Sequence, residues 1–268
     1  ILFIYIIYIL IIYIMNELNI KEIQNEHIKL SKMCFSCDGV DESVPYPLPQ
    51  KKNFFMALVG KPGSGKTSLL MNLITKKNKC FNRKFDKVFL FSPSLATDKK
   101  NKFSQLPADQ IFEELSIENL DNVLQRVKGS GDDVLLILDD VINDITKSTE
   151  LQRNLCRVIM NRRHLTTDGE HGTMGLILTT QVAIKIPAPI RKCITHLVLF
   201  NTSNKKELQT IFDEFISIPK KKFIEILKYC FKSKHDFIYL NLEEEIKNQY
   251  HNKFNKLTFD ASNEYDLR

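Results

Sequence analysis

The stretch Gly60-Lys61-Pro62-Gly63-Ser64-Gly65-Lys66-Thr67 decides the fold, because it lies between an apolar run at 54–59 and a helix predicted over 67–77. It matches Gly-x-x-x-x-Gly-Lys-[Ser/Thr] at every fixed position. The 268 residues include only nine glycines, and three of them lie in this loop. A loop that wraps a phosphate turns tightly and directs backbone N–H groups inward, which glycine permits. The stretch therefore predicts a buried strand, a phosphate-binding loop and a helix whose N-terminus adds positive potential.

Within this loop we expect Lys66 to contact the β- and γ-phosphates of a nucleoside triphosphate and Thr67 to ligate Mg²⁺. An ordinary glycine-containing turn is the alternative, but the strand before the loop and the helix after it favour the phosphate site. The predicted nucleotide-binding residues are Gly60, Lys61, Pro62, Gly63, Ser64, Gly65, Lys66, Thr67 and Ser68.

A second apolar strand, predicted over 134–138, ends in Asp139 and Asp140. In open α/β folds, ligands bind at the carboxyl edge of the sheet, where such residues lie. We expect Asp139 to hold Mg²⁺ through water, and Asp140 to orient and polarise the attacking water. For this segment taken alone, the alternative is a strand followed by a solvated acidic turn.

Three further residues are candidates for the reaction. Gln181 ends another predicted strand, where a polar side chain can lie beside the γ-phosphate and report hydrolysis; a plain strand-end cap is the alternative. Hydrolysis also needs a positive charge, often an arginine supplied in cis or by a neighbouring subunit. Arg163 ends the helix after the acidic pair, and Arg191 follows the Gln181 strand. Basic residues that end a helix also complement its dipole, so the choice between the two arginines stays open.

Uniformly apolar strands alternate with amphipathic helices, which implies an α/β domain with a mostly parallel sheet covered on both faces. The predicted strands are 54–59, 87–92, 134–138, 174–179, 197–200 and, last, 237–242. The predicted helices are 67–77, 117–128, 148–163, 207–215 and 220–231. Strand 87–92 lies between the Walker A strand (54–59) and the Walker B strand (134–138) in sequence. That order suits ATPases that insert a strand between those two in the sheet, so we expect a three-layer P-loop NTPase sandwich over 53–242.

The N-terminal segments differ in composition from this domain. Residues 1–14 contain eight Ile, three Tyr, two Leu and one Phe and no charge, and the first Met is Met15. With Met15 the run is shorter than the roughly 18 residues of a membrane helix, and it lacks the basic and small residues of a signal peptide. We interpret 1–14 as an AT-rich leader read in frame upstream of the start. A membrane-contacting or docking segment and a first strand are the alternatives; no stable membrane span is expected.

Residues 15–52 are predicted to be an N-terminal arm, weakly helical over 15–32, followed by a linker that contains Pro45, Pro47 and Pro49. Residues 243–268 are predicted to be a charged C-terminal tail. Cys34 and Cys37 have CxxC spacing, but zinc needs four ligands and no second pair follows, so free thiols are expected.

The composition bounds the class of protein. With 43% hydrophobic and 26% charged residues, the chain is neither collagen-like nor disordered. Its net charge of +6 allows a nucleic-acid partner. No Asn-Lys-x-Asp or Ser-Gly-Gly-Gln-like signature is present, which disfavours a GTPase and a transporter-type ATPase. A small-molecule kinase would not need two acids at one strand end and a glutamine at another.

Five segments, in order, resemble the DNA-packaging ATPases of poxviruses and other nucleocytoplasmic large DNA viruses, which are similar to the FtsK–HerA group. They are Gly60 to Thr67, Ile137-Leu138-Asp139-Asp140, Asn161-Arg162-Arg163-His164, Leu178-Thr179-Thr180-Gln181 and Pro189-Ile190-Arg191. The resemblance implies an ATP- and Mg²⁺-dependent motor that works as a homo-oligomeric ring, translocates double-stranded DNA into a preformed capsid and meets capsid or virion-assembly proteins. It implies action at viral assembly sites in the host cytoplasm and in the virion, without secretion.

By this resemblance Lys66 and Thr67 bind phosphate, Asp139 and Asp140 are the metal and catalytic acids, and Gln181 is the sensor. Many relatives in the wider group carry Asp-Glu where this chain has Asp139-Asp140. Two other functions remain open: a nucleotide-switched assembly factor that hydrolyses little ATP, and a helicase-loader-type ATPase that does not pump DNA.

Overall fold

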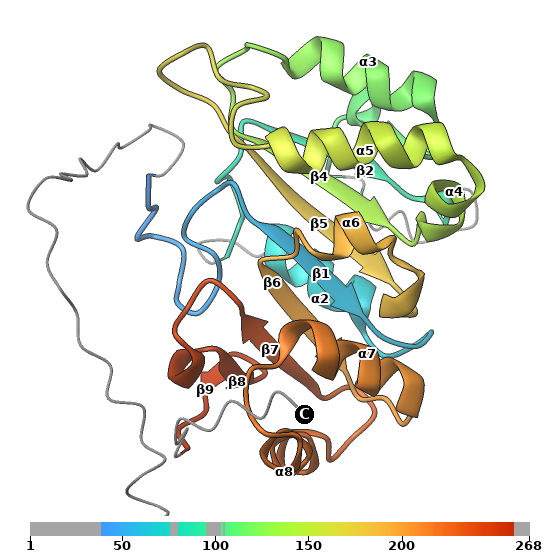
Figure 1. Ribbon diagram of the computed structural model, residues 1–268. Coiled ribbons are helices and arrows are strands. Elements are labelled where there is room, and N and C mark those ends of the chain that lie inside the picture. Colours follow the sequence, from blue (N-terminus) through green and yellow to red (C-terminus); the bar gives the residue numbers. More distant parts are fainter. Residues whose placement is uncertain (1–38, 76–79, 95–102, 104, 260–268) are drawn as a thin grey trace, which may run out of the picture. The chain divides into compact units, whose positions relative to one another are not determined.

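The apolar run before the phosphate-binding loop forms β1 (Phe55–Val59), a wholly buried strand inside a nine-stranded sheet (Figure 1). The computed structural model describes residues 39–75, 80–94, 103 and 105–259. The strand order is β3-β2-β4-β5-β1-β6-β7-β8-β9. The pairs from β3 to β6 are parallel, and those from β6 to β9 are antiparallel. The predicted α/β fold with a mostly parallel sheet is confirmed.

The predicted elements agree with the observed ones to within two residues at each end. The other strands are β2 (Lys87–Phe91), β3 (Ile111–Phe112), β4 (Val134–Asp139), β5 (Met174–Thr180), β6 (His196–Phe200), β7 (Phe237–Asn241), β8 (Tyr250–Asn252) and β9 (Asn255–Lys256). The α-helices are α2 (Lys66–Thr75), α3 (Ile117–Val127), α4 (Ile142–Lys147), α5 (Thr149–Asn161), α6 (Ala188–Arg191), α7 (Lys205–Phe215) and α8 (Lys220–Cys230). Short 3₁₀ turns are η3 (Ala108–Gln110), η4 (Ala183–Lys185) and η5 (Ile246–Asn248).

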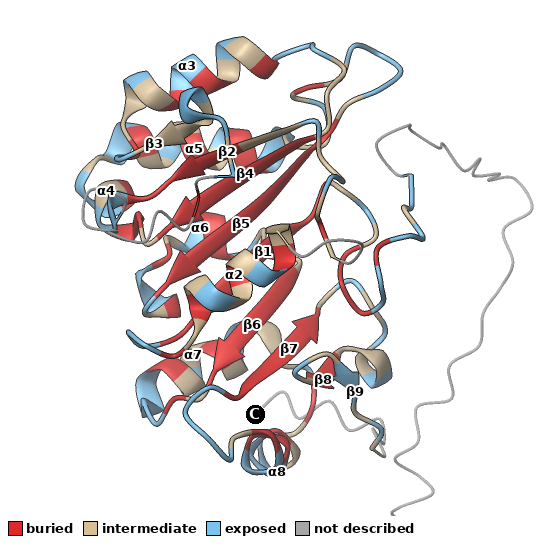
Figure 2. Cartoon of the chain, turned by 180° about the vertical axis from the view of Figure 1, so that it is seen from behind, coloured by how far each residue is buried: buried red, intermediate tan, exposed pale blue. Residues whose placement is uncertain are grey.

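The two faces of the sheet are covered unequally. Because successive strand residues point to opposite faces, alternate positions of β1, β4 and β5 feed two separate cores. One core packs against apolar residues of α3 to α8. The other packs against Leu70 and Leu73 of α2, together with Val44 and Leu48 from the proline-containing segment. Figure 2 shows the buried central strands and α2 in front of them. The helices therefore enclose the sheet and leave its carboxyl edge for the loops.

Local capping explains where several helices begin. The hydroxyl of Ser148 accepts a hydrogen bond from the backbone N–H of Leu151 at the start of α5. Ser116 caps α3 in the same way, and the side chain of Asn204 accepts two backbone N–H bonds at the start of α7. These caps fix where α5 and α7 leave the loops that follow β4 and β6.

In the sheet, β5 lies between β1 and β4. Strand β2, which lies between them in sequence, pairs with β4 on its far side. The strand that separates the phosphate-binding loop from the acidic strand end is therefore the one that leads to Gln181.

The structure differs from the prediction in several features. Strand β7 is not the last, because β8 and β9 extend the sheet within the segment predicted to be a charged tail. The predicted proline-containing linker packs on the domain: Val40 bridges Lys51, and the hydroxyl of Tyr239 donates to the carbonyl oxygen of Pro47 at 2.7 Å. The short helices α4 and α6 were not predicted, because four to six residues are too few for a periodic pattern.

Several predictions concern residues outside the described part of the chain. These are the leader at 1–14, the helix at 15–32 and the thiols of Cys34 and Cys37. Among the described residues, no helix has both the length and the apolar character needed to cross a bilayer.

Replacing Leu136 by alanine should lower the free energy of unfolding by about 2–5 kcal/mol, because Leu136 is fully buried in β4 and the substitution leaves a cavity. Urea-induced unfolding measures the change. Met160→Ala on α5, where the side chain is 59% exposed, is the control and should cost far less. Equal losses in the two variants would contradict the placement of β4 in the core.

Candidate nucleotide-binding site

The phosphate-binding loop joins β1 to α2 and requires glycine at specific positions. Gly63 and Gly65 have φ values of +71° and +109°, which residues with a side chain rarely adopt. At Gly60, an added Cβ would lie 2.7 Å from both the Cβ of Phe200 and the Oγ of Ser64. The loop therefore has its tight turns and its close approach to β6 because these residues lack side chains.

Lys66 folds back over this loop from the first turn of α2. Its Nζ donates to the carbonyl oxygen of Gly60 at 2.5 Å and to that of Lys61 at 3.3 Å. Burial lowers the pKa of Lys66, while the nearby carboxylates of Asp140 and Asp139 act in the opposite direction. The ammonium group is thus held at the loop, within the field of both predicted acidic residues.

Asp139 ends β4 and is 4% exposed. Its two carboxylate oxygens accept hydrogen bonds from the strands on either side: Ser92 Oγ, after β2, at 3.0 Å, and Thr179 Oγ1, in β5, at 2.6 Å. The hydroxyls fix the orientation of the carboxylate and leave it further lone pairs, as a water-mediated metal ligand requires.

Asp140 and Gln181 are brought together at the same edge. Gln181 Nε2 donates to Asp140 Oδ2 at 3.0 Å. Asp140 has a φ of +56°, a left-handed conformation that aspartate tolerates better than most residues, and its N–H donates to both oxygens of Thr179. The turn directs Asp140 away from β4 and towards the residue that follows β5.

The structure thus unites most of the predicted site. The loop at 60–65, Lys66, Asp139, Asp140 and Gln181 all lie where β1, β4 and β5 end. Thr67 is half-buried and Ser68 exposed in the first turn of α2. The described residues contain no group of three or more His, Cys, Asp or Glu that could hold a metal ion. A hydroxyl at Thr67, an oriented carboxylate at Asp139 and the phosphates themselves form a donor set that suits Mg²⁺.

Arg163 is not part of this group. The neighbouring Arg162 donates from Nε to the carbonyl oxygen of Asn53 at 2.6 Å, and its own carbonyl accepts from the N–H of Met174. Asn53 and Met174 lie where β1 and β5 begin, so the two arginines are at the amino edge of the sheet. That edge is about 17 Å from the loop along the five residues of β1, beyond the reach of an arginine in the same chain.

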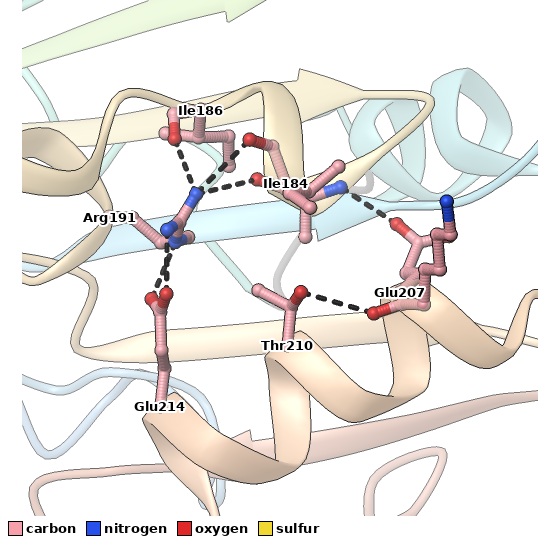
Figure 3. Close-up of polar contacts among 8 residues, drawn as sticks. Ile184, Ile186, Arg191, Glu207, Thr210 and Glu214 are labelled. Carbon is pink, nitrogen blue, oxygen red and sulfur yellow. Dashed lines mark hydrogen bonds and ion pairs between the residues drawn. The ribbon is translucent and has the colours of Figure 1, made fainter.

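Arg191 is held elsewhere, in a network that Figure 3 shows. Its guanidinium pairs with both carboxylate oxygens of Glu214 on α7, at 2.5 and 2.6 Å. Its Nη1 also donates to the carbonyl oxygen of Ile186 at 2.7 Å and to that of Ile184 at 3.2 Å. The side chain is 8% exposed. This geometry gives Arg191 a structural role, which the sequence does not predict: it ties the segment after Gln181 to α7.

Two residues at this edge of the sheet were not predicted from the sequence. Ser92 is the last residue of the predicted strand 87–92, a signal comparable to that of Gln181, and it orients Asp139. Glu207 of α7 accepts the N–H of Ala183 at 2.7 Å, and burial raises the pKa of its carboxyl while Lys61 opposes the shift. Nothing in the amphipathic pattern of α7 singles out Glu207.

The glycine loop on a parallel sheet, with acidic and amide side chains at the adjoining strand ends, defines a P-loop NTPase. The family model described as "Poxvirus A32 protein" matches residues 48–254. The chain therefore belongs to the poxvirus A32 protein family, which confirms the resemblance inferred from its motifs. A comparison with curated protein sequences gives no match.

A solved structure shares the fold, and two others are similar to the chain at lower scores. B204, the DNA-packaging ATPase from Sulfolobus turreted icosahedral virus, is 15% identical with a TM-score of 0.51, over 71% of this chain and 93% of B204. The genome packaging NTPase B204 from Sulfolobus turreted icosahedral virus 2, in complex with ATPγS, is 16% identical, with a TM-score of 0.49 over 72% and 94%. The pCW3 conjugation coupling protein TcpA is 11% identical, with a TM-score of 0.45 over 70% and 58%.

Replacing Arg191 by alanine should lower the free energy of unfolding by about 2 kcal/mol, because Glu214 and the η4 carbonyls lose their partner. The affinity for ADP should change little. Urea-induced unfolding and calorimetric titration measure the two effects, with the exposed neighbour substitution Lys192→Ala as control. A variant of unchanged stability that loses turnover would contradict this structural role.

Proposed function

We propose that this chain is an ATP-hydrolysing motor that translocates double-stranded viral DNA into the capsid during virion assembly. The observation that carries the proposal is the hydrogen bond from Gln181 to Asp140 beside the Lys66 loop. A site that only binds nucleotide needs the loop; an acid coupled to a strand-end amide adds the means to hydrolyse it.

The loop residues have distinct roles in this proposal. Backbone N–H groups of Gly63, Gly65 and the first turn of α2 surround the phosphates, and Lys66 moves from the carbonyl oxygen of Gly60 to the β- and γ-phosphates. Thr67 and Asp139 would hold Mg²⁺, which supplies positive charge to the phosphates when it is bound. Asp139 is already oriented by Ser92 and Thr179, so little reorganisation is needed.

Asp140 and Gln181 act as a pair. Asp140 orients and polarises the attacking water, and Gln181 lies beside the γ-phosphate. Because Gln181 donates to Asp140, a change at the γ-phosphate alters the position of both groups. Gln181 also begins the segment that Glu207 and Arg191 tie to α7, so the same change is passed to the helix.

The positive charge for the transition state comes, in this proposal, from a neighbouring copy of the chain. Arg163 lies at the amino edge, so it serves only the nucleotide of another subunit. This requirement supports a homo-oligomeric ring, in which the proposal gives the role in trans to Arg163.

Double-stranded DNA is the proposed substrate of the motion. Membership of the poxvirus A32 family and the fold shared with a DNA-packaging ATPase support this, as does the net charge of +6. Capsid or virion-assembly proteins are the expected partners, and the site of action is viral assembly in the host cytoplasm.

Lys66→Ala should lower the rate of ATP hydrolysis by about a hundredfold, because the phosphates lose their main positive side chain. Duplex DNA should raise the rate of the unsubstituted protein. Phosphate release measures both, and Lys128→Ala on the surface is the control. Tight ATP binding with negligible turnover, with or without DNA, would favour the nucleotide-switched assembly factor instead. ATPase activity that loads a partner onto DNA without movement along it would favour the helicase loader.

Asp140→Asn and Gln181→Ala should each lower the turnover number, and the double variant should be little slower than the more damaged single one. Groups that act as a unit have non-additive effects. Asparagine adopts the left-handed conformation of Asp140, so the turn is kept. A steady-state ATPase comparison of the four proteins gives the coupling, and strictly multiplicative losses would show that the two residues act independently.

A further inference from the structure

The segment from 231 to 236, which joins α8 to β7, lies against the phosphate-binding loop, and no motif predicts a role for it. His235 Nδ1 is 3.1 Å from the carbonyl oxygen of Ser64. The Nζ of Lys234 lies 3.2 Å from the position that a Cβ on Gly63 would occupy. A cation and an imidazole are therefore placed at the rim of a loop built to surround phosphate.

A buried carboxylate fixes the backbone of this segment. Asp236 accepts the N–H groups of Lys232 and Ser233 at 3.0 and 2.6 Å, and it pairs with Lys253 at 3.0 Å. The bond to Lys253 is the main cause that lowers the pKa of Asp236 to about 2. Asn201, after β6, donates to the carbonyl oxygen of Ser233 at 3.0 Å. Although Lys234 and His235 are exposed, the chain that carries them is held in one place.

The segment approaches the loop from the side opposite the acids. Strands β6 and β7 follow β1 in one direction across the sheet, and β5 and β4 follow it in the other. The acids and the 231–236 segment therefore flank the phosphate-binding loop on opposite sides.

We propose that Lys234 is a second nucleotide-phosphate ligand, which contacts the phosphates held in the loop from the β6–β7 side. The inference rests on the proposed binding of ATP at this loop. Gly63 bears no side chain, so nothing at that position separates the ammonium group from the loop backbone. ADP and ATP carry the same phosphates inside the loop, so both should depend on Lys234.

His235 is a positioning residue in this proposal. Its Nδ1–H donates to the carbonyl oxygen of Ser64, which holds the 231–236 segment against the loop and Lys234 over Gly63. This hydrogen bond joins residues that are 171 positions apart in sequence. It links the 231–236 segment to the phosphate-binding loop.

Calorimetric titration of the full chain with ADP and with ATPγS tests Lys234. Lys234→Ala should lower the affinity for both nucleotides by about tenfold, the effect of losing one charge-assisted hydrogen bond. Lys234→Arg should retain most of the affinity. Lys232→Ala removes the same charge from the same segment, away from Gly63, and is the matched control. Equal affinities of the Lys234→Ala and Lys232→Ala proteins, both with unchanged thermal unfolding, would overturn the inference.

The role of His235 is tested by rescue. His235→Ala should lower the affinity for both nucleotides. His235→Asn should restore it, because the side-chain amide of asparagine can donate a hydrogen bond in place of Nδ1. Failure of asparagine to restore binding, or no loss with alanine, would remove His235 from the proposal.

Lys66→Ala separates this inference from the proposed function. If the unsubstituted chain binds neither nucleotide, or Lys66→Ala leaves binding unchanged, the proposed function fails and this inference fails with it. If Lys66→Ala abolishes binding while Lys234→Ala equals its control, only the role of Lys234 is wrong.

Discussion

The parallel register of β1, β5 and β4 is the constraint on which the site depends. Leu58 and Asp139 both pair with Thr179, and Val59 pairs with Thr180. Three strands consequently end within about one residue of one another. Since neighbouring strands lie about 4.8 Å apart, the loop after β1 and the acids after β4 are about 10 Å apart, with Gln181 between them. A shift of register by one residue would turn Asp139 to the other face of the sheet and break its bonds to Ser92 and Thr179.

The irregular segments that border this edge are held in place by carboxylates. Glu207 and Glu214 lie on α7, and both bind the short segment that follows Gln181, one through Ala183 and the other through Arg191. The segment contains only the short η4 and α6, and these bonds give it a fixed path. On the other side of β1, Asp236 does the same for the segment that carries Lys234 and His235. The loop is thus bordered by two segments, each anchored by a buried carboxylate: Glu207 on one side and Asp236 on the other.

Much of this arrangement could be predicted from the sequence, because it depends on strand ends. The glycine loop, Asp139, Asp140 and Gln181 each follow an apolar run, and parallel strands bring their carboxyl ends to one edge. The roles of the arginines could not be predicted. The role of Arg191 depends on Glu214, a partner that only the packing of α7 brings near. The position of Arg163 depends on the edge of the sheet at which helix α5 ends. Lys234 and His235 lie against a loop that is 171 positions away in sequence, and a local sequence pattern cannot predict a contact over that separation. The proline-containing segment was predicted to be a linker because its prolines exclude a helix. They do not exclude burial, and Val44 and Leu48 are buried.

The most direct test of the central claim is a structure of the full chain crystallised with Mg²⁺ and ATPγS. The account predicts the β-phosphate inside the loop at 60–67, the metal ion beside Thr67 on the Asp139 side, and the γ-thiophosphate facing Asp140 and Gln181. Asp139 should keep its hydrogen bonds to Ser92 and Thr179, while Lys66 leaves the carbonyl oxygen of Gly60 for the phosphates. A nucleotide bound away from this edge, or a terminal phosphate turned away from Asp140 and Gln181, would contradict it.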